Sequence, residues 1–196
     1  MAEKPDQQFA RVRGHLIREV LRRSLATFIL WRPLVNLVRA LASGSIIHPL
    51  ARIDWNVRLG RRCFVGQAVL DTLGGNGRID IGDGSIIYSG TEMLCHHGSV
   101  IRIGSNVLFT RGAGAVTGGH VIDDPRATII SQGIRTADIT VEDDVWIGYR
   151  AILLPGSHVG RGTVVAAGAV VAGTLPPGVV AAGVPAREIR KRETKE

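Results

Sequence analysis

A histidine near the middle of the chain stands where a regular pattern breaks off. His120 follows two glycines at the start of residues 117–138, a segment without regular spacing. An imidazole with its ordinary pKa near 6.5 accepts a proton at neutral pH, so His120 is a candidate general base. Asp123 or Asp124 could orient the ring and fix its tautomer. The alternative is that Asp124 simply begins a turn with Pro125.

The two cysteines point to no chemistry of their own. Cys63 and Cys95 are far apart and lack CxxC spacing, so the sequence suggests neither a disulfide framework nor a thiolate zinc site. A reducing, cytoplasmic setting is the simplest fit. We also expect no signal peptide and no membrane span, because the uncharged apolar run 24–31 is far shorter than the roughly 20 residues a span needs.

A six-residue period over residues 139–172 predicts the scaffold that holds His120. One branched aliphatic residue recurs at every sixth position, which fits neither a helix nor an ordinary strand. The pattern is typical of a parallel β-helix, in which stacked coils of about eighteen residues bury the aliphatic residues in columns. The residues that set the period are Val141, Ile147, Leu153, Val159, Val165 and Val171.

The period also marks the domain boundaries. It begins near Ile46, slips at residues 71–77 and 91–100, and stops before Pro176 and Pro177, so the β-helix domain is expected over residues 45–186. Residues 117–138 are expected to project from one corner as a loop, the kind of segment that often carries function. Residues 187–196 read as a short basic C-terminal helix or tail.

Residues 1–44 are expected to form a polar end and a basic helical arm. The net charge of the chain is +7, and residues 1–62 hold twelve Lys or Arg against four Asp or Glu. Residues 11–31 have the pattern of a helix with one apolar face and one basic face. Pro33 should separate this helix from a second one over 34–42. The arm either packs on the solenoid or a neighbouring subunit, or lies on an anionic membrane. Nucleic-acid binding is the weaker option, because bulky aliphatic residues rather than stacking aromatics are interleaved with the basic residues.

Several short motifs resemble the hexapeptide-repeat acyltransferases, in particular the branch of galactoside, maltose and polysaccharide O-acetyltransferases. The likeness covers about residues 100–192, in the order and near the spacing of that family. The motifs are Thr117-Gly-Gly-His120, Val145-Trp-Ile-Gly148, Ala166-Ala-Gly-Ala169, Leu175-Pro-Pro177 and Ala182-Gly-Val-Pro-Ala186.

This resemblance implies a left-handed β-helix that assembles as a homotrimer, with coenzyme A in a groove between adjacent solenoids. It implies that His120 is the general base. Asp124 would orient the base, and the Gly148 amide would hold the oxyanion. The cofactor-binding residues would be Trp146, Tyr149, Ala167, Gly168, Ala169, Arg187 and Arg190.

Three departures from the family pattern affect the ligands. Residues 172–174 are Ala-Gly-Thr where relatives usually have Thr-Lys-Asp, which removes a cation that often faces the nucleotide. Tyr149 replaces a smaller residue and narrows the groove, and Gly90 stands where simple sugar acetyltransferases have an acceptor-binding Asn. The same small acceptor is therefore not expected.

The sequence thus predicts an acetyl-CoA-dependent O-acetyltransferase that acts on a sugar, a polysaccharide or a lipid-linked saccharide precursor, without a metal. The expected location is cytoplasmic, with peripheral contact to the inner membrane face. An amine or a small alcohol would use the same base. The alternatives are a non-catalytic β-helix scaffold and a β-helix zinc carbonic anhydrase, which would need three convergent His ligands from His96, His97 and His120.

Overall fold

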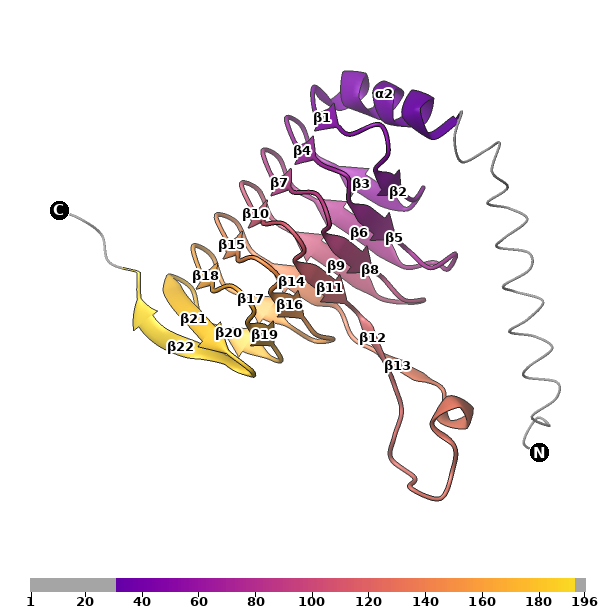
Figure 1. Ribbon diagram of the computed structural model, residues 1–196, viewed down its shortest axis with the longest axis vertical. Helices are drawn as coiled ribbons and strands as arrows, with labels where there is room; N and C mark the ends of the chain where they lie inside the picture. The colour runs from indigo at the N-terminus through magenta and orange to yellow at the C-terminus, as the bar shows by residue number, and fades with distance from the viewer. Residues whose placement is uncertain (1–30, 193–196) are drawn as a thin grey trace.

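Short parallel strands stack into three sheets that form the faces of a triangular prism (Figure 1). The computed structural model describes residues 31–192. The chain passes through sheet A, sheet B and sheet C in turn, and one complete passage makes one coil. Strands of successive coils pair in parallel and in register, as Ile46 and Ile47 pair with Phe64 and Val65.

The strands are mostly two to four residues long. Sheet A contains β1 (Ile46–Ile47), β4 (Phe64–Val65), β7 (Ile86–Ile87), β10 (Leu108–Phe109), β15 (Trp146–Ile147), β18 (Val164–Val165), β21 (Val179–Gly183) and β22 (Ala186–Lys191). Sheet B contains β2 (Arg52–Ile53), β5 (Val69–Asp71), β8 (Glu92–Leu94), β11 (Gly114–Val116), β16 (Ile152–Leu153) and β19 (Val170–Val171). Sheet C contains β3 (Val57–Leu59), β6 (Arg78–Ile81), β9 (Val100–Ile103), β14 (Ile139–Val141), β17 (His158–Val159) and β20 (Thr174–Leu175).

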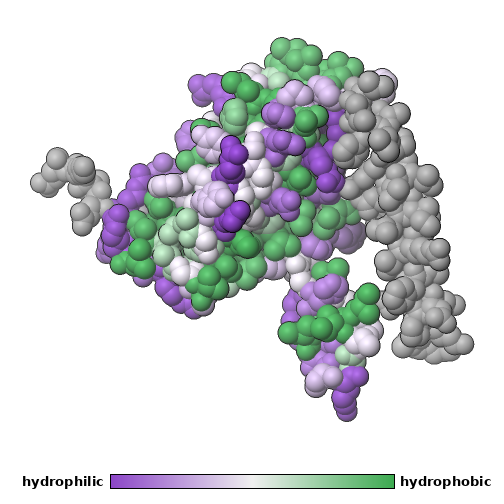
Figure 2. Space-filling model, in the orientation of Figure 1, coloured by the Kyte–Doolittle hydropathy of each residue, from purple (hydrophilic) through white to green (hydrophobic). Residues whose placement is uncertain are grey.

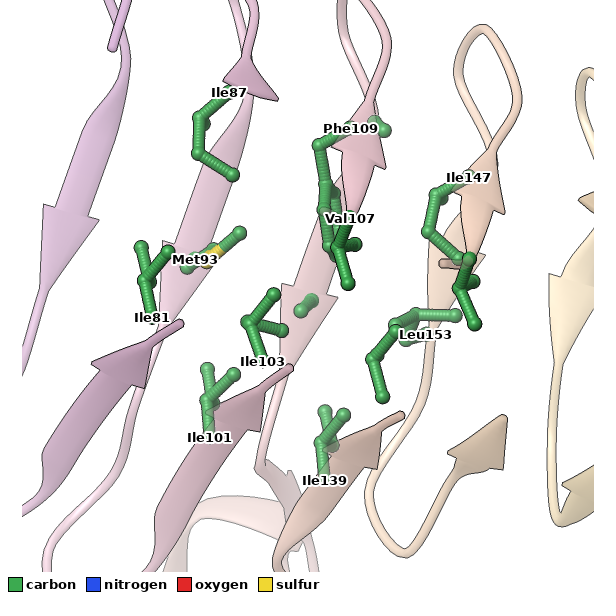
Figure 3. Close-up of a cluster of buried hydrophobic side chains, with 14 of the residues drawn as sticks. Ile81, Ile87, Met93, Ile101, Ile103, Val107, Phe109, Ile139, Ile147 and Leu153 are labelled. Atoms are coloured by element: carbon green, nitrogen blue, oxygen red, sulfur yellow. The ribbon is translucent and has the colours of Figure 1, made fainter. Parts of the chain in front are cut away.

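The core consists of aliphatic columns that run along the inside of the prism. The six residues that set the six-residue period are all buried, each with at most 1% of its surface exposed. In sheet A, Phe109 lies in register between Ile87 and Ile147 (Figure 3). Burying one such side chain contributes about 1.5–3 kcal/mol, and only the next coil can bury it. The predicted parallel β-helix is confirmed.

Helix α2 (Arg32–Ser43) covers the N-terminal end of the prism (Figure 1). The sequence predicted it at 34–42, whereas the structure begins it at Arg32, so that Pro33 lies in its first turn. Gly44 ends it in a left-handed conformation at φ 62°. The first coil has no preceding coil to pair with its backbone, so α2 provides side-chain donors instead. Asn36 donates to the carbonyls of His48, Pro49 and Ala51, and Arg39 donates to those of Ile53 and Asp54.

The helix predicted over residues 11–31 lies outside the described residues, apart from Trp31. Within residues 31–192, no helix is long and apolar enough to cross a membrane.

The turns that join sheet B to sheet C, here called the B–C corner, contain every large irregularity of the repeat. Residues 72–77, 95–99 and 117–138 all lie there, in successive coils. The turns contact one another: the Gly98 amide donates to the Asn76 side chain, and the His96 amide donates to the Thr117 hydroxyl. The slips in the period therefore stack at one edge of the prism.

The C-terminal segment is a strand, so the predicted basic helix over 187–196 is wrong for the described residues. Strand β22 turns back and pairs antiparallel with β21 at the end of sheet A, with Ala182 opposite Arg187. The Arg192 amide also donates to the Gly178 carbonyl. The last coil leaves its outer backbone groups without a following coil, and pairing them outweighs the helical preference of the sequence.

Candidate active site

Residues 117–138 form an arm that extends from the B–C corner (Figure 1). Strand β12 (Gly118–His120) pairs antiparallel with β13 (Ile134–Thr136), and a short 3-10 turn, η2 (Ile129–Gln132), lies nearer the tip. At the base, the Ala137 amide donates to the Thr117 carbonyl. Asp138 accepts from the Arg102 guanidinium and the Val100 amide, and the Arg102 hydrogen bond is the main reason that the Asp138 pKa is lowered. The base of the arm is thus fixed to the prism.

His120 is exposed at the end of β12, opposite Ile134. The antiparallel pair fixes its backbone, and its side chain is near enough to His96 to affect the pKa of that ring. An exposed histidine on a rigid strand can reach a ligand that binds at the B–C corner and can accept its proton.

His96 lies near His120, a proximity that the sequence did not predict. Its ring packs so closely on Gly118 that a Cβ there would be 2.5 Å from His96 Cγ. Partial burial of the ring lowers the pKa of His96, the Leu94 carbonyl opposes this shift, and the positive charge of protonated His120 adds to it. The slip in the repeat at 91–100 could have predicted this position, because such a slip places His96 at the same corner as the arm.

The predicted link between Asp124 and His120 is not formed. The Asp124 carboxylate accepts from the backbone amide and the guanidinium of Arg126, as in the turn that the sequence offers as the alternative. Asp123 pairs with Arg135 at 2.7 Å. Both carboxylates therefore have local partners, since an arginine within the arm attracts them more strongly than a neutral imidazole does.

Gly148 does not offer a free amide, which corrects its predicted role as the oxyanion donor. Its N–H donates to the Val165 carbonyl at 2.8 Å, as part of the bonding between coils. A Cβ at this position would lie 2.5 Å from that same carbonyl oxygen. The glycine is therefore required by the close stacking of the coils.

We predict that Gly148→Ala lowers the free energy of unfolding by about 1–3 kcal/mol, because the added methyl group must push two coils apart. Urea unfolding followed by circular dichroism measures the change. Gly119→Ala is the matched control, since a Cβ there meets nothing within 4 Å, and its effect should stay below about 0.5 kcal/mol. Equal stability of the two variants would contradict the proposed reason for Gly148.

A groove of about 630 Å³ lies on the outer face of sheet A and brings together two of the predicted cofactor residues. Trp146, with 47% of its surface exposed, lies in the wall with Arg190 of β22. The groove is mainly apolar beside the tryptophan, and beside β22 it holds Arg190 together with the ion pair of Arg192 and Asp144. Its other lining residues include Leu108, Val164, Val180 and Arg192.

The remaining predicted cofactor residues are divided between the surface and the core. Ala167 and Gly168 are exposed at the turn that joins sheet A to sheet B, and the Gly168 amide donates to the Tyr149 carbonyl. Tyr149 is exposed, with the Arg150 guanidinium 5.1 Å from its ring centre. Ala169, predicted to lie along the pantetheine arm, is fully buried in the core of this chain.

Arg187 is exposed on β22 and donates to the carbonyl of Ala186. Both cysteines are buried and unpaired. No group of three His, Cys, Asp or Glu residues able to hold a metal occurs within residues 31–192.

The structure does not bring His120 and the groove together within one chain. His120 lies at the B–C corner, whereas Trp146 and Arg190 lie on sheet A, the face opposite that corner of the triangle. Tyr149 and Gly168 lie at the A–B corner, one face away from His120.

Comparison with known proteins matches the repeat and the fold. Residues 138–173 match the family model described as bacterial transferase hexapeptide (six repeats). Over 115 residues the chain is 39% identical to a Saccharomyces cerevisiae protein named putative acetyltransferase YJL218W, which covers 55% of this chain and 57% of that protein. The chain spans about half the length of the curated relatives it matches.

Two solved structures have a similar β-helix. One is a hexapeptide-repeat acetyltransferase, VCA0836 of Vibrio cholerae, complexed with acetyl-CoA; the TM-score is 0.56 at 24% identity, covering 99% of this chain and 93% of that one. The other is a variant of AntD, an N-acyltransferase of Bacillus cereus, in complex with dTDP and coenzyme A; the TM-score is 0.63 at 20% identity, covering 80% and 88%. These likenesses establish the fold.

Proposed function

From the premise of a hexapeptide-repeat β-helix, we propose that this protein transfers an acetyl group from acetyl-CoA to a hydroxyl group of a saccharide. The observation that carries the proposal is His120, exposed on a fixed strand at one corner of this fold. The names of the relatives support the acetyl donor.

In the proposed reaction, the acceptor oxygen attacks the thioester carbonyl of acetyl-CoA while His120 removes the hydroxyl proton. The C–S bond then breaks, and the imidazolium returns the proton to the leaving thiolate. His96, held largely neutral by its lowered pKa, places no second positive charge beside His120. The positive charge that His120 gains when it takes up the proton therefore meets no like charge from His96.

The lowered pKa of His96 predicts a pH dependence of stability. A lowered pKa in the folded state means that the unfolded chain binds more protons, so stability is complete above about pH 6.5 and falls as the pH drops toward the lowered pKa. Urea unfolding between pH 8 and pH 5 should show a smaller loss in His96→Asn than in the wild type. His97→Asn, at the exposed neighbouring position, should behave like the wild type. The same loss in all three proteins would contradict the assignment.

We further propose that coenzyme A binds between two subunits of a homotrimer. The support is the separation within one chain between His120 and the groove beside Trp146 and Arg190. The groove fits coenzyme A chemically, because an apolar wall suits the pantetheine arm and arginine suits the phosphates. In a closed ring, one subunit would present its groove to the arm of the next.

Active-site complementation tests the shared site. His120→Ala and Trp146→Ala each remove a different half of the proposed site, so each homomer should have low activity. Mixed assemblies, formed by co-expression of the two variants, should recover about a quarter of wild-type activity, because one interface in four combines two intact halves. If mixed trimers, verified by mass, recovered no activity, His120 and Trp146 would either belong to a site within one chain or belong to no shared site.

The acceptor is proposed to be a polysaccharide or a lipid-linked saccharide precursor rather than a small free sugar. Gly90 lies in the turn between β7 and β8, where it offers no side-chain amide to a sugar hydroxyl. Thiol release from acetyl-CoA with free sugars, oligosaccharides, amino sugars and simple alcohols identifies the class. If amino sugars were the better acceptors, the proposed reaction would be N-acetylation instead of O-acetylation. No release with any acceptor and no coenzyme A binding by calorimetry would favour a non-catalytic scaffold.

A further inference from the structure

Helix α2 presents an apolar stripe to the outside of the molecule. Four aliphatic residues at helical spacing have 50–75% of their surface exposed: Leu34, Leu37, Val38 and Leu41. The polar residues Asn36 and Arg39 of the same helix face the prism, where they bind the free carbonyls of the first coil. The usual arrangement of an amphipathic surface helix, with its apolar side on the core, is therefore reversed.

Other exposed apolar side chains extend the stripe at the same end of the prism. Leu50 lies between Pro49 and Ala51, whose carbonyls bind Asn36. Trp55 is 84% exposed, and the Arg39 guanidinium lies 5.7 Å from its ring centre. Figure 2 shows the resulting hydrophobic surface at the end occupied by α2. This surface, here called the N-terminal patch, consists of Leu34, Leu37, Val38, Leu41, Leu50 and Trp55.

The chain around the N-terminal patch is strongly basic. Residues 31–62 contain six arginines and one aspartate, a net charge of +5. Two of these arginines, Arg52 and Arg61, pair with Asp71 and Asp83 of the next coil, which leaves +3. Residues 1–30 contain six Lys or Arg and three Asp or Glu, a further +3. A second copy of this end, or the preceding segment folded over the patch, would bring like charge against like charge.

We propose that the N-terminal patch docks on an anionic lipid bilayer. Exposed aliphatic side chains enter the boundary between headgroups and acyl chains, and tryptophan prefers that depth because its ring is apolar and its N–H is polar. Arginines beside the patch attract the anionic headgroups. The long axis of the prism then points away from the membrane, and the arm at the B–C corner extends from the side of the prism toward the surrounding solution.

Vesicle co-sedimentation of the full chain tests the proposal. Wild-type protein should bind vesicles of phosphatidylglycerol and phosphatidylcholine and should bind pure phosphatidylcholine vesicles weakly. The double variant Leu37→Ser/Leu41→Ser should bind the anionic vesicles about tenfold less or weaker still, because two side chains lose their apolar contact. Ile189→Ser is the matched control, since Ile189 is 61% exposed on β22, away from α2, and its binding should equal that of the wild type.

Trp55→Ala is the second variant, outside the helix, and it should also bind less. Tryptophan emission adds an independent readout: the wild type should shift to shorter wavelength on anionic vesicles, and Trp55→Ala should shift less. If the double variant bound anionic vesicles as well as the wild type does, the proposal would be overturned, because residues 1–30 would then suffice for vesicle binding. A lower assembly mass of the double variant, with unchanged vesicle binding, would assign the patch to contacts between copies instead. None of these results depends on acetyl transfer.

Discussion

Replacing His120 by alanine is expected to lower kcat for acetyl transfer by about 10²- to 10⁴-fold, with little change in the KM for acetyl-CoA. The variant loses the group proposed to remove the acceptor proton, whereas the groove on sheet A is left intact. Steady-state thiol release with the best acceptor of the panel gives both constants. Because His120 is exposed, its removal should not destabilise the β-helix.

Asp124→Asn is the matched control for this experiment. Its carboxylate is held by Arg126 within the arm, so kcat should stay within about threefold of the wild type. A large loss of kcat in this variant would mean that the Asp124 carboxylate does take part in proton transfer. Full activity of His120→Ala would remove the central residue of the proposed mechanism.

The largest effect on stability is expected from Phe109→Ala, which should lower the free energy of unfolding by about 3–5 kcal/mol. Phe109 is the bulkiest fully buried side chain of the described core and lies midway along the sheet A column, between Ile87 and Ile147 (Figure 3). Its neighbours belong to rigid coils that cannot collapse into the cavity. Urea unfolding measures the loss.

Phe64→Ala gives the comparison within the same sheet. Phe64 points outward, is only partly buried, and contacts Tyr88 with 5.9 Å between the ring centres. Its replacement should cost about 1 kcal/mol. If both variants lost the same stability, the distinction between the inner and outer faces of sheet A would be wrong.

The scaffold was predictable because its periodicity is a direct consequence of its geometry. A side chain that must fill a column at every sixth position leaves a repeat in the sequence, so Val141 to Val171 predicted the coils. Helix α2 was predictable because Pro33 and Gly44 act locally at its two ends. The C-terminal strand was not, because the need to pair the edge of β21 is a property of the completed sheet and leaves no local signal.

The candidate site was predictable in part. A motif placed His120 in the arm, but motifs say nothing about which hydrogen bonds a residue already makes. The amide of Gly148 is used between coils, and the carboxylate of Asp124 is used by Arg126. The nearness of His96 to His120 depends on the stacking of two irregular turns from successive coils, which no spacing along the chain reveals.

The gathering of all long turns at the B–C corner has an evolutionary consequence. The aliphatic columns tolerate no insertion, since one added residue would displace the rest of a coil, whereas this corner accommodates turns as different as 95–99 and 117–138. Insertions and deletions can therefore accumulate beside His120 without refolding the prism. Under the proposed function, such a corner would allow descendants of one gene to acquire new acceptors while the groove on sheet A stays unchanged.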